Sequence, residues 1–186
     1  MDHQIRNIHL TAMLENNSTP EELAPALEIG NVHETPGMQN EEPIHGAAWH
    51  SSYTANIDLL MAHGADINAR DEYQETPLFY AVKGKYPEIM IPHLLAKGAD
   101  LEARNDYQQT PFLAALDYCD DPVPVITLLK NAGCDLSVTD EHGNGALEYA
   151  AMHGNDLKLF ETLYEFGCVP KPEVPDENRH PNDDPM

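Results

Sequence analysis

The residues of this sequence best suited to catalysis or metal binding are two histidines and three cysteines. His45 and His50 form an HxxxxH pair, whereas Cys119, Cys134 and Cys168 include no CxxC pair. No HExxH, phosphate-binding loop, nucleophile elbow or zinc-type CxxC occurs. Cys119 lies in DYCDDP, where neighbouring acids raise the pKa of a thiol and reduce its reactivity. The sequence therefore predicts no catalytic residue, no metal site and no cofactor.

The length and the cysteine content favour a protein of a reducing compartment. A chain of 186 residues is long enough for one ordinary domain or for an array of small units. Three cysteines, an odd number, suit a reducing compartment better than an oxidising one. The N-terminus has no basic region followed by an uninterrupted apolar stretch, and no segment has the length of a membrane span. We therefore expect a soluble, cytoplasmic protein, with export by a route that needs no such signal left open.

The most extreme feature of the composition is its negative charge. Asp and Glu outnumber Lys and Arg by 32 to 10, which gives a formal net charge of -22. Electrostatic repulsion disfavours binding to nucleic acid or to an anionic membrane. A basic partner is the natural complement of such a chain. The alternative is that the acidity only keeps a small protein soluble.

Five glycines recur at a nearly constant interval. Gly30, Gly64, Gly98, Gly133 and Gly167 stand 34, 34, 35 and 34 residues apart. Self-similarity at this period is typical of stacked supersecondary units. Because glycine tolerates the left-handed conformation that ends a helix, each glycine is expected to close a helix and begin a turn.

The segments after the second and third of these glycines predict a loop followed by two helices. ADINARDEYQE and ADLEARNDYQQ are polar, and they lead into Thr76-Pro77 and Thr110-Pro111. A threonine cap with proline at the first helical position is a typical helix start. A second helix follows and ends in Leu-Leu just before the next glycine.

This order of elements resembles the ankyrin repeat, and the resemblance covers about residues 30–167. EPIHGAA at residues 42–48 and GALEYAA at residues 145–151 carry the same helix start with substitutions. The resemblance implies an all-α ankyrin-repeat solenoid of stacked helix-turn-helix units with finger loops. The implied units are an N-terminal capping helix pair at residues 1–30 and four repeats at residues 31–64, 65–98, 99–133 and 134–167.

Some residues depart from the family pattern. Pro92 in the second repeat, and Pro122 with Pro124 in the third, are expected to bend or delay the second helix. Gln74 and Gln108 stand where the family normally has a turn glycine, which predicts less regular finger turns.

The resemblance also bears on the residues that could do chemistry. His45 occupies a position that is structural in the family, where the imidazole hydrogen-bonds neighbouring turns, and this favours structure over metal binding. Cys134 and Cys168 occupy the place that Ala65 and Ala99 fill in earlier repeats, so they are expected to be small buried residues.

The two ends of the chain are expected to differ. An apolar face precedes the helix start at Ser18-Thr19-Pro20, as in a capping unit that shields the end of an array. That face consists of Ile5, Ile8, Leu10 and Leu14. Residues 168–186 contain five prolines and many charges, which predicts a disordered, acidic, proline-rich tail. A tail that contacts a partner is the alternative.

The resemblance further predicts which face binds a partner. In ankyrin proteins the tips of the finger loops and the residues just after the first helices line one side of the stack, where partners usually bind. The residues predicted to contact a partner are Trp49, His50, Glu72, Tyr73, Glu75, Asp106, Tyr107, Asp117, Tyr118, Glu141, His142 and Met152. Further finger and floor positions are Lys83, Gln109, Asn144 and His153. The alternative is that the finger tyrosines pack on adjacent turns and that Trp49 is half-buried core.

These features lead to the hypothesis of a protein-binding module that binds and inhibits a basic protein. Large aromatic rings dominate interface energetics, and interleaved carboxylates select a basic ligand. A short free-standing array of this charge resembles the ankyrin-type immunity or inhibitor proteins that bacteria pair with toxic enzymes. The free protein is expected to be a monomer.

Two other classes of function remain open from the sequence. The first is an adaptor or secreted effector that recruits a cellular target. The second, more distant, is an enzyme with an unrecognised site around His45, His50, Asp117 and Cys119.

Overall fold

The structure is a computed structural model, and it describes residues 10–28, 30–33, 35, 39–152 and 156–168. Every regular element within these ranges is a helix. Residues 10–15 are helical. The helices that follow are α2 (Pro20–Leu27), α3 (Pro43–His50), α4 (Thr54–Ala62), α5 (Pro77–Lys83), α6 (Pro87–Ala96), α7 (Pro111–Tyr118), α8 (Pro122–Asn131), α9 (Ala146–Met152) and α10 (Leu157–Phe166). The all-α prediction is confirmed over these residues.

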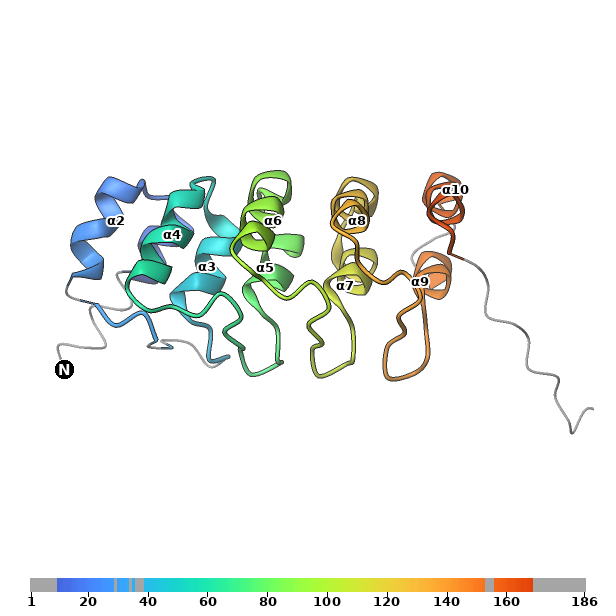
Figure 1. Cartoon of the computed structure of the whole chain (residues 1–186), viewed down its shortest axis with the longest axis horizontal. Coiled ribbons are helices and arrows are strands. Elements are labelled where there is room, and N and C mark those ends of the chain that lie inside the picture. The colour runs from blue at the N-terminus through green and yellow to red at the C-terminus, as the bar shows by residue number, and fades with distance from the viewer. Residues whose placement is uncertain (1–9, 29, 34, 36–38, 153–155, 169–186) are drawn as a thin grey trace, which may run out of the picture.

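The helices stack along one axis in two layers (Figure 1). In one layer α3, α5, α7 and α9 each contact the next, and in the other α2, α4, α6, α8 and α10 do the same. The layers are joined by contacts between α3 and α4, α5 and α6, α7 and α8, and α9 and α10. This is the stacked array of helix pairs that the ankyrin resemblance predicts.

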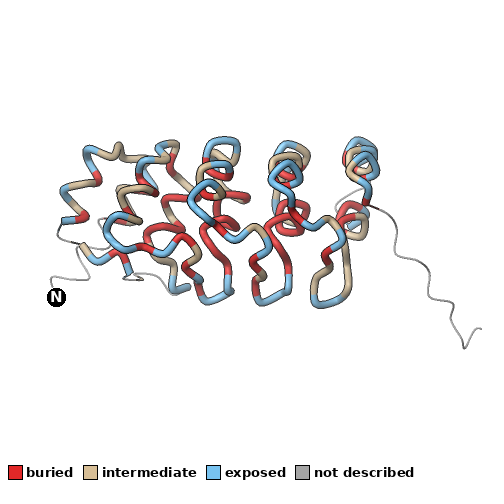
Figure 2. Tube along the Cα trace, in the orientation of Figure 1, coloured by how far each residue is buried: buried red, intermediate tan, exposed pale blue. Residues whose placement is uncertain are grey.

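Finger-like loops extend from one side of this stack, between each second helix and the first helix of the next repeat (Figure 1). Figure 2 shows that the tips of these fingers are exposed. The stretches that return to the helices are buried in the second and third repeats and intermediate in the first and fourth. The fingers therefore project a polar edge from an apolar stack.

Proline and glycine mark the helix ends as predicted. Proline is the first residue of α3, α5 and α7. Gly64, Gly98, Gly133 and Gly167 have φ angles of 99°, 93°, 93° and 91°. This left-handed conformation strains any residue with a side chain, which explains why glycine recurs there.

One expected helix cap is absent. Thr110 accepts a hydrogen bond from the Leu113 N–H at 3.5 Å, whereas Thr76 makes no such bond. Among the described residues the buried Thr76 hydroxyl has no hydrogen-bond partner. The prediction of a hydroxyl cap is therefore confirmed at Thr110 and wrong at Thr76.

The prolines of the second helices do not delay them. Pro122 is the first residue of α8, where a missing N–H is harmless, and Pro124 lies in the same turn. Pro92 lies inside α6, which nevertheless continues to Ala96. Both helices are 10 residues long, so the expected delay is wrong.

The N-terminal unit packs on the first repeat. Leu10 and Leu14 are fully buried in the core of the stack. Asn17 and Ser52 are joined through hydrogen bonds that include one from the Ser52 N–H to Asn17 Oδ1 at 2.7 Å and one from the Asn17 amide to Ser52 Oγ at 2.9 Å. The expected shielding of the first repeat is thus seen in the described part of the unit.

Some sequence predictions fall outside the described residues. Ile5 and Ile8 of the predicted capping face are among them. So are the floor residue His153 and residues 169–186 of the predicted tail.

Candidate functional site

Three successive fingers are built around the same kind of residue at the base of each loop. These residues are Asp71, Asn105 and Asp140. In each case one side-chain oxygen accepts the backbone N–H groups two and four residues later, at 2.8 to 3.1 Å. Such bonds hold a tight turn through its own backbone. The fingers are therefore fixed loops.

Backbone hydrogen bonds also link each finger tip to the next. They run from the N–H of Glu72 to the oxygen of Gln39 at 2.9 Å, from Asp106 to Tyr73 at 2.9 Å, and from Glu141 to Tyr107 at 3.1 Å. This ladder sets the spacing of the tips, so side chains on neighbouring fingers keep a constant register.

The turn at each tip is regular, although only one finger has glycine there. Gln74, Gln108 and Gly143 have φ angles of 61°, 59° and 79°, and Asn40 has 53° at the equivalent place in the first repeat. The expectation of less regular turns at the two glutamines is wrong. Since the left-handed conformation costs a non-glycine residue roughly 1–2 kcal/mol, the surrounding hydrogen bonds outweigh that cost.

In two repeats, a tyrosine on the first helix hydrogen-bonds the aspartate at the base of the finger. The Tyr80 hydroxyl lies 2.8 Å from Asp71 Oδ2, and the Tyr149 hydroxyl lies 2.9 Å from Asp140 Oδ2. Burial raises the pKa of Tyr149 to about 12 and also raises that of Tyr80, so both hydroxyls remain protonated donors. The intervening repeat has Ala114 at this position and lacks the tie.

A pocket of about 460 Å³ lies between the first and second repeats. Its lining, here named the Trp49 pocket, consists of Gln39, Glu41, Gly46, Trp49, His50, Tyr73, Glu75, Tyr80 and Lys83. The Trp49 ring meets the Tyr80 ring edge-on, with centroids 5.9 Å apart. Residues of a finger and of the floor thus line one pocket.

A second pocket, of about 220 Å³, lies between the third and fourth repeats. Its lining, here named the Tyr118 pocket, consists of Tyr107, Gln109, Asp117, Tyr118, Asp140, Glu141, His142 and Tyr149. The Gln109 amide donates to Asp117 Oδ2 at 2.8 Å and to the Tyr149 oxygen at 2.9 Å. Burial, with Asp117 nearby, raises the pKa of Tyr118.

Lys83 lines the Trp49 pocket and also lies near a ring of the Tyr118 pocket. Its ammonium is paired with the Glu75 carboxylate and lies 5.5 Å from the centre of the Tyr80 ring and 5.1 Å from that of Tyr118. Glu75 is only 7% exposed. Because this carboxylate is buried and already paired, we leave Glu75 out of the binding surface proposed below.

The pockets bring together nine of the twelve residues predicted to contact a partner, and Glu72, Asp106 and Met152 lie outside both. Glu72 and Asp106 are exposed beside the finger tyrosines, and Met152 is exposed at the end of α9. Trp49 is half-buried against the core, as the structural interpretation expected, while still lining its pocket.

The residues first considered for metal binding have structural surroundings. His45 is fully buried; its Nε2 lies 3.1 Å from the Ala69 oxygen, and its Nδ1 accepts the Glu42 N–H at 3.1 Å. The structural role predicted for His45 is therefore confirmed. Within the described ranges no group of three or more His, Cys, Asp or Glu residues is placed to hold a metal ion.

The cysteines are poorly suited to nucleophilic chemistry. Burial, followed by the charges of Asp120 and Asp121, raises the pKa of Cys119 to about 11. Burial likewise raises the pKa of Cys134 to about 12, and it also raises the pKa of Cys168. Both of these cysteines are buried, as predicted from their position in the repeat.

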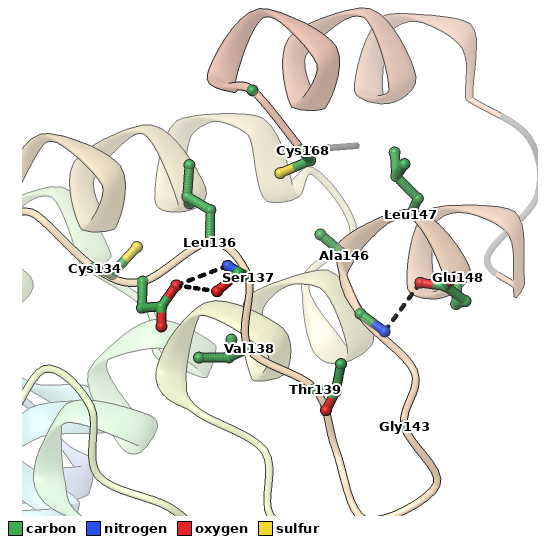
Figure 3. Close-up of a pocket in the computed structure, with 13 residues that line it drawn as sticks. Cys134, Leu136, Ser137, Val138, Thr139, Gly143, Ala146, Leu147, Glu148 and Cys168 are labelled. Carbon is green, nitrogen blue, oxygen red and sulfur yellow. Dashed lines mark hydrogen bonds between the residues drawn. The ribbon is translucent and has the colours of Figure 1, made fainter. Parts of the chain in front are cut away.

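A hollow of about 570 Å³ at the far end of the stack does not belong to this surface (Figure 3). Its apolar lining includes Cys134, Leu136, Val138, Ala146, Leu147 and Cys168. Leu78 and Phe112, which occupy the position of Leu147 in earlier repeats, are fully buried. The hollow is therefore the face that each earlier repeat packs against its successor, at the end of the described stack.

Sequence reasoning missed several residues that line the pockets. They are Gln39, Glu41, Gly46, Tyr80, Asp140 and Tyr149. These residues could have been predicted from their equivalent positions in the repeats. Gln39 and Glu41 stand 34 residues before Tyr73 and Glu75, and Tyr80 and Tyr149 occupy the same place in α5 and α9.

Comparison with protein families matches residues 44–91 to ankyrin repeats (many copies). Residues 44–91 carry repeats of the ankyrin repeat family, and the same helix-pair geometry continues through α10. The repeats of this family are typically non-catalytic modules that bind other proteins. None of the curated proteins matches the chain. No helix in the described ranges is long and apolar enough to cross a membrane.

Proposed function

We propose that this protein binds a basic protein through its fingers and floor and thereby blocks that protein's activity. The proposed contact residues, here named the finger-floor surface, are Trp49, His50, Glu72, Tyr73, Asp106, Tyr107, Asp117, Tyr118, Glu141, His142 and Met152. The observation that carries the proposal is the alternation of exposed rings and carboxylates on a hydrogen-bonded ladder of fingers.

The rings are exposed although they are large. Tyr73, Tyr107 and Tyr118 are 38%, 47% and 52% exposed. Tyrosine provides a large contact area with few rotatable bonds, so it loses little entropy when it is immobilised in an interface. Because the finger backbones are already fixed, little further ordering is required when a partner binds.

The acids occupy one repeated position. Glu72, Asp106 and Glu141 are all exposed, and each directly precedes a ring residue of its finger tip. With a net charge of -22, the chain attracts a basic partner over a distance of about one Debye length, ~8 Å at physiological salt. Charge thus supplies speed and selectivity, and the rings supply affinity.

Inhibition follows if this surface covers a functional site of the partner. A standard protein interface buries about 800 Å² on each side, which is enough to cover an active site. The prebuilt fingers and the resemblance to immunity proteins support an inhibitor. An adaptor would bind without loss of its target's activity.

The test is capture of partners from the native source at low and moderate salt, followed by kinetics and activity assays on the captured protein. Tyr73→Ala or Tyr107→Ala should mainly speed dissociation, by about 30-fold if each ring is a hot spot worth ~2 kcal/mol. The combined change Glu72→Gln and Asp106→Asn should mainly slow association and flatten its salt dependence.

Lys158→Ala and Glu161→Ala provide the matched control, because both residues are exposed on α10, away from the fingers. Equal losses from these changes and from the tyrosine changes would place the binding face elsewhere. A captured protein whose activity is unaffected at saturation would contradict inhibition.

A further inference from the structure

We propose that the Tyr118 pocket receives an arginine side chain of the partner. This inference rests on the proposed function and assigns a chemical preference to one part of the finger-floor surface. The pocket combines the exposed rings of Tyr107 and Tyr118 with the carboxylates of Asp117, Asp140 and Glu141. None of the eight residues in its lining is lysine or arginine.

The protein already holds a cation with the same groups at the neighbouring position. The Lys83 ammonium lies near the rings of Tyr80 and Tyr118 and is paired with the Glu75 carboxylate. A cation within about 6 Å of a ring centroid is attracted by the π-electrons. Where its own chain supplies a cation, the surface binds it. The Tyr118 pocket shares the Tyr118 ring with Lys83, and it adds the ring of Tyr107 and the carboxylates of Asp117, Asp140 and Glu141, which are the same kinds of group.

The geometry of the acids favours a guanidinium over an ammonium. Asp117 lies on α7 at the floor, whereas Glu141 lies on the finger of the fourth repeat, so two carboxylates approach the pocket from different elements. A guanidinium is planar, carries five donors and stacks on rings, so it can use both acids and a ring together. An ammonium is compact and more strongly hydrated.

The third carboxylate, Asp140, contributes negative charge to the pocket, but most of its hydrogen-bonding capacity is already used. Asp140 accepts hydrogen bonds from the backbone of His142 and Asn144, from the Asn144 amide and from the Tyr149 hydroxyl. Burial by itself would raise the pKa of Asp140, but these bonds outweigh it, and the pKa lies below its ordinary value. Asp140 therefore stays ionised and adds to the negative potential of the pocket.

The Trp49 pocket is a built-in comparison site. It also contains rings and acids, but its lining includes the Lys83 ammonium, which is paired with Glu75, whereas the lining of the Tyr118 pocket includes no lysine or arginine. A cationic ligand is therefore expected to prefer the Tyr118 pocket.

The test uses the full chain and three blocked tripeptides: Gly-Arg-Gly, Gly-Lys-Gly and the neutral isostere Gly-citrulline-Gly. Titration followed by NMR should show saturable shifts at Tyr107, Tyr118 and the Gln109 side-chain amide with the arginine peptide. The citrulline peptide should bind about tenfold more weakly, because it loses the ion pair and the cation–π contact. Equal binding of the lysine peptide, or shifts scattered over the acidic surface, would overturn the assignment.

Variants connect the shifts to the pocket. Tyr118→Leu and Asp117→Asn should each weaken binding of the arginine peptide several-fold, whereas Tyr118→Phe should preserve it. Tyr164→Leu, on the exposed side of α10 and outside both pockets, is the matched control and should bind as the wild type does. Because Tyr118 is 52% exposed, its replacement is compatible with folding. Full binding by the Tyr118→Leu variant would overturn the proposal.

The outcome separates this inference from the proposed function. If the peptide binds as expected but no protein partner is captured, the arginine pocket stands and the proposed function fails. If a partner is captured and Asp117→Asn and Tyr118→Leu leave its Kd unchanged, the proposed function stands and the arginine pocket fails.

Discussion

The Trp49 pocket and the Tyr118 pocket occupy equivalent places two repeats apart, yet they carry different chemistry. Both rest on a tyrosine that hydrogen-bonds the aspartate of a finger, Tyr80 to Asp71 in one and Tyr149 to Asp140 in the other. They differ on the floor, where tryptophan in the first pocket is replaced by aspartate in the second. Lys83 accompanies the first pocket, and the equivalent residue of the fourth repeat is methionine.

This difference shows which residues define the site and which adjust it. The finger aspartates and the buried tyrosines are tied to backbone or to each other, so they define where a pocket forms. The floor residues change from repeat to repeat without altering the helices around them. The proposed binding surface therefore varies by a few substitutions at repeated positions, while the fingers and helices around it stay the same.

The largest expected effect is a loss of stability when Lys83, the cation of the Trp49 pocket, is replaced. Lys83→Met gives the second repeat the methionine that the fourth repeat has at the equivalent position. It also removes the cation that is paired with the buried Glu75 carboxylate. Removing one partner of a buried ion pair costs about 3–5 kcal/mol. We expect the free energy of unfolding, measured by urea denaturation, to fall by about 3 kcal/mol.

Lys85→Met is the matched control, because Lys85 is exposed and lies two residues away. Adding Glu75→Gln to Lys83→Met should recover part of the loss, since it removes the unpaired charge. A loss below about 0.5 kcal/mol for Lys83→Met would mean that the pair is held like an ordinary surface ion pair.

The next effect tests the bonds that the two pockets share. Tyr80→Phe and Tyr149→Phe each remove one hydroxyl that hydrogen-bonds a carboxylate, which typically costs about 1.5–3 kcal/mol. The cost should be larger for Tyr80, because its partner Asp71 is buried, whereas Asp140, the partner of Tyr149, is partly exposed. Urea denaturation measures both, with Tyr164→Phe on the exposed side of α10 as the control. Equal stability of all three variants would show that the fingers do not depend on these ties.

The finger turns next to the two pockets differ at their left-handed position, which is Gln74 in one and Gly143 in the other. Substitutions at this position should have a smaller effect on stability. Gln74→Gly should stabilise the protein by about 0.5–1 kcal/mol, because it relieves a left-handed residue with φ of 61°. Gly143→Ala should destabilise it by about 1 kcal/mol for the converse reason. Thermal melting measures both changes. If both variants lower Tm, the Gln74 side chain contributes more to its finger than its backbone strain costs.

The fold was predictable because its signals are local and repeated. Glycines in left-handed turns and prolines at helix starts follow from backbone geometry, so they could be read from residue type and spacing. The regularity at Gln74 and Gln108 was not predictable in this way, because it depends on bonds between neighbouring fingers. The burial of Glu75 was missed for a related reason, since its partner Lys83 lies on the following helix.

The candidate surface was only partly predictable from the sequence. Exposed positions such as Tyr73 and Tyr107 follow from their place at the finger tips. Tyr80 and Tyr149 were not predicted as site residues, because their contribution depends on hydroxyl bonds to carboxylates in the loops. Which acids remain available to a partner depends on the packing of both elements.

The smallest expected effect assigns pH dependence near neutrality to the Trp49 pocket. Burial, followed by the charge of Lys85, lowers the pKa of His50 below 6.5, although Glu15 and Glu41 oppose the shift. The unfolded chain then binds the proton more readily than the folded one, so stability contributed by neutral His50 is present above pH 6.5 and is lost as the pH falls through the folded pKa. The equivalent residue of the other pocket, Tyr118, has a pKa above its usual value of 10 and does not titrate in this range.

We therefore expect His50→Gln to flatten the decline of Tm between pH 7 and 5, whereas Tyr118→Phe should retain the wild-type slope. If His50→Gln leaves the slope unchanged while Tyr118→Phe alters it, the assignment of this pH dependence to the Trp49 pocket is wrong.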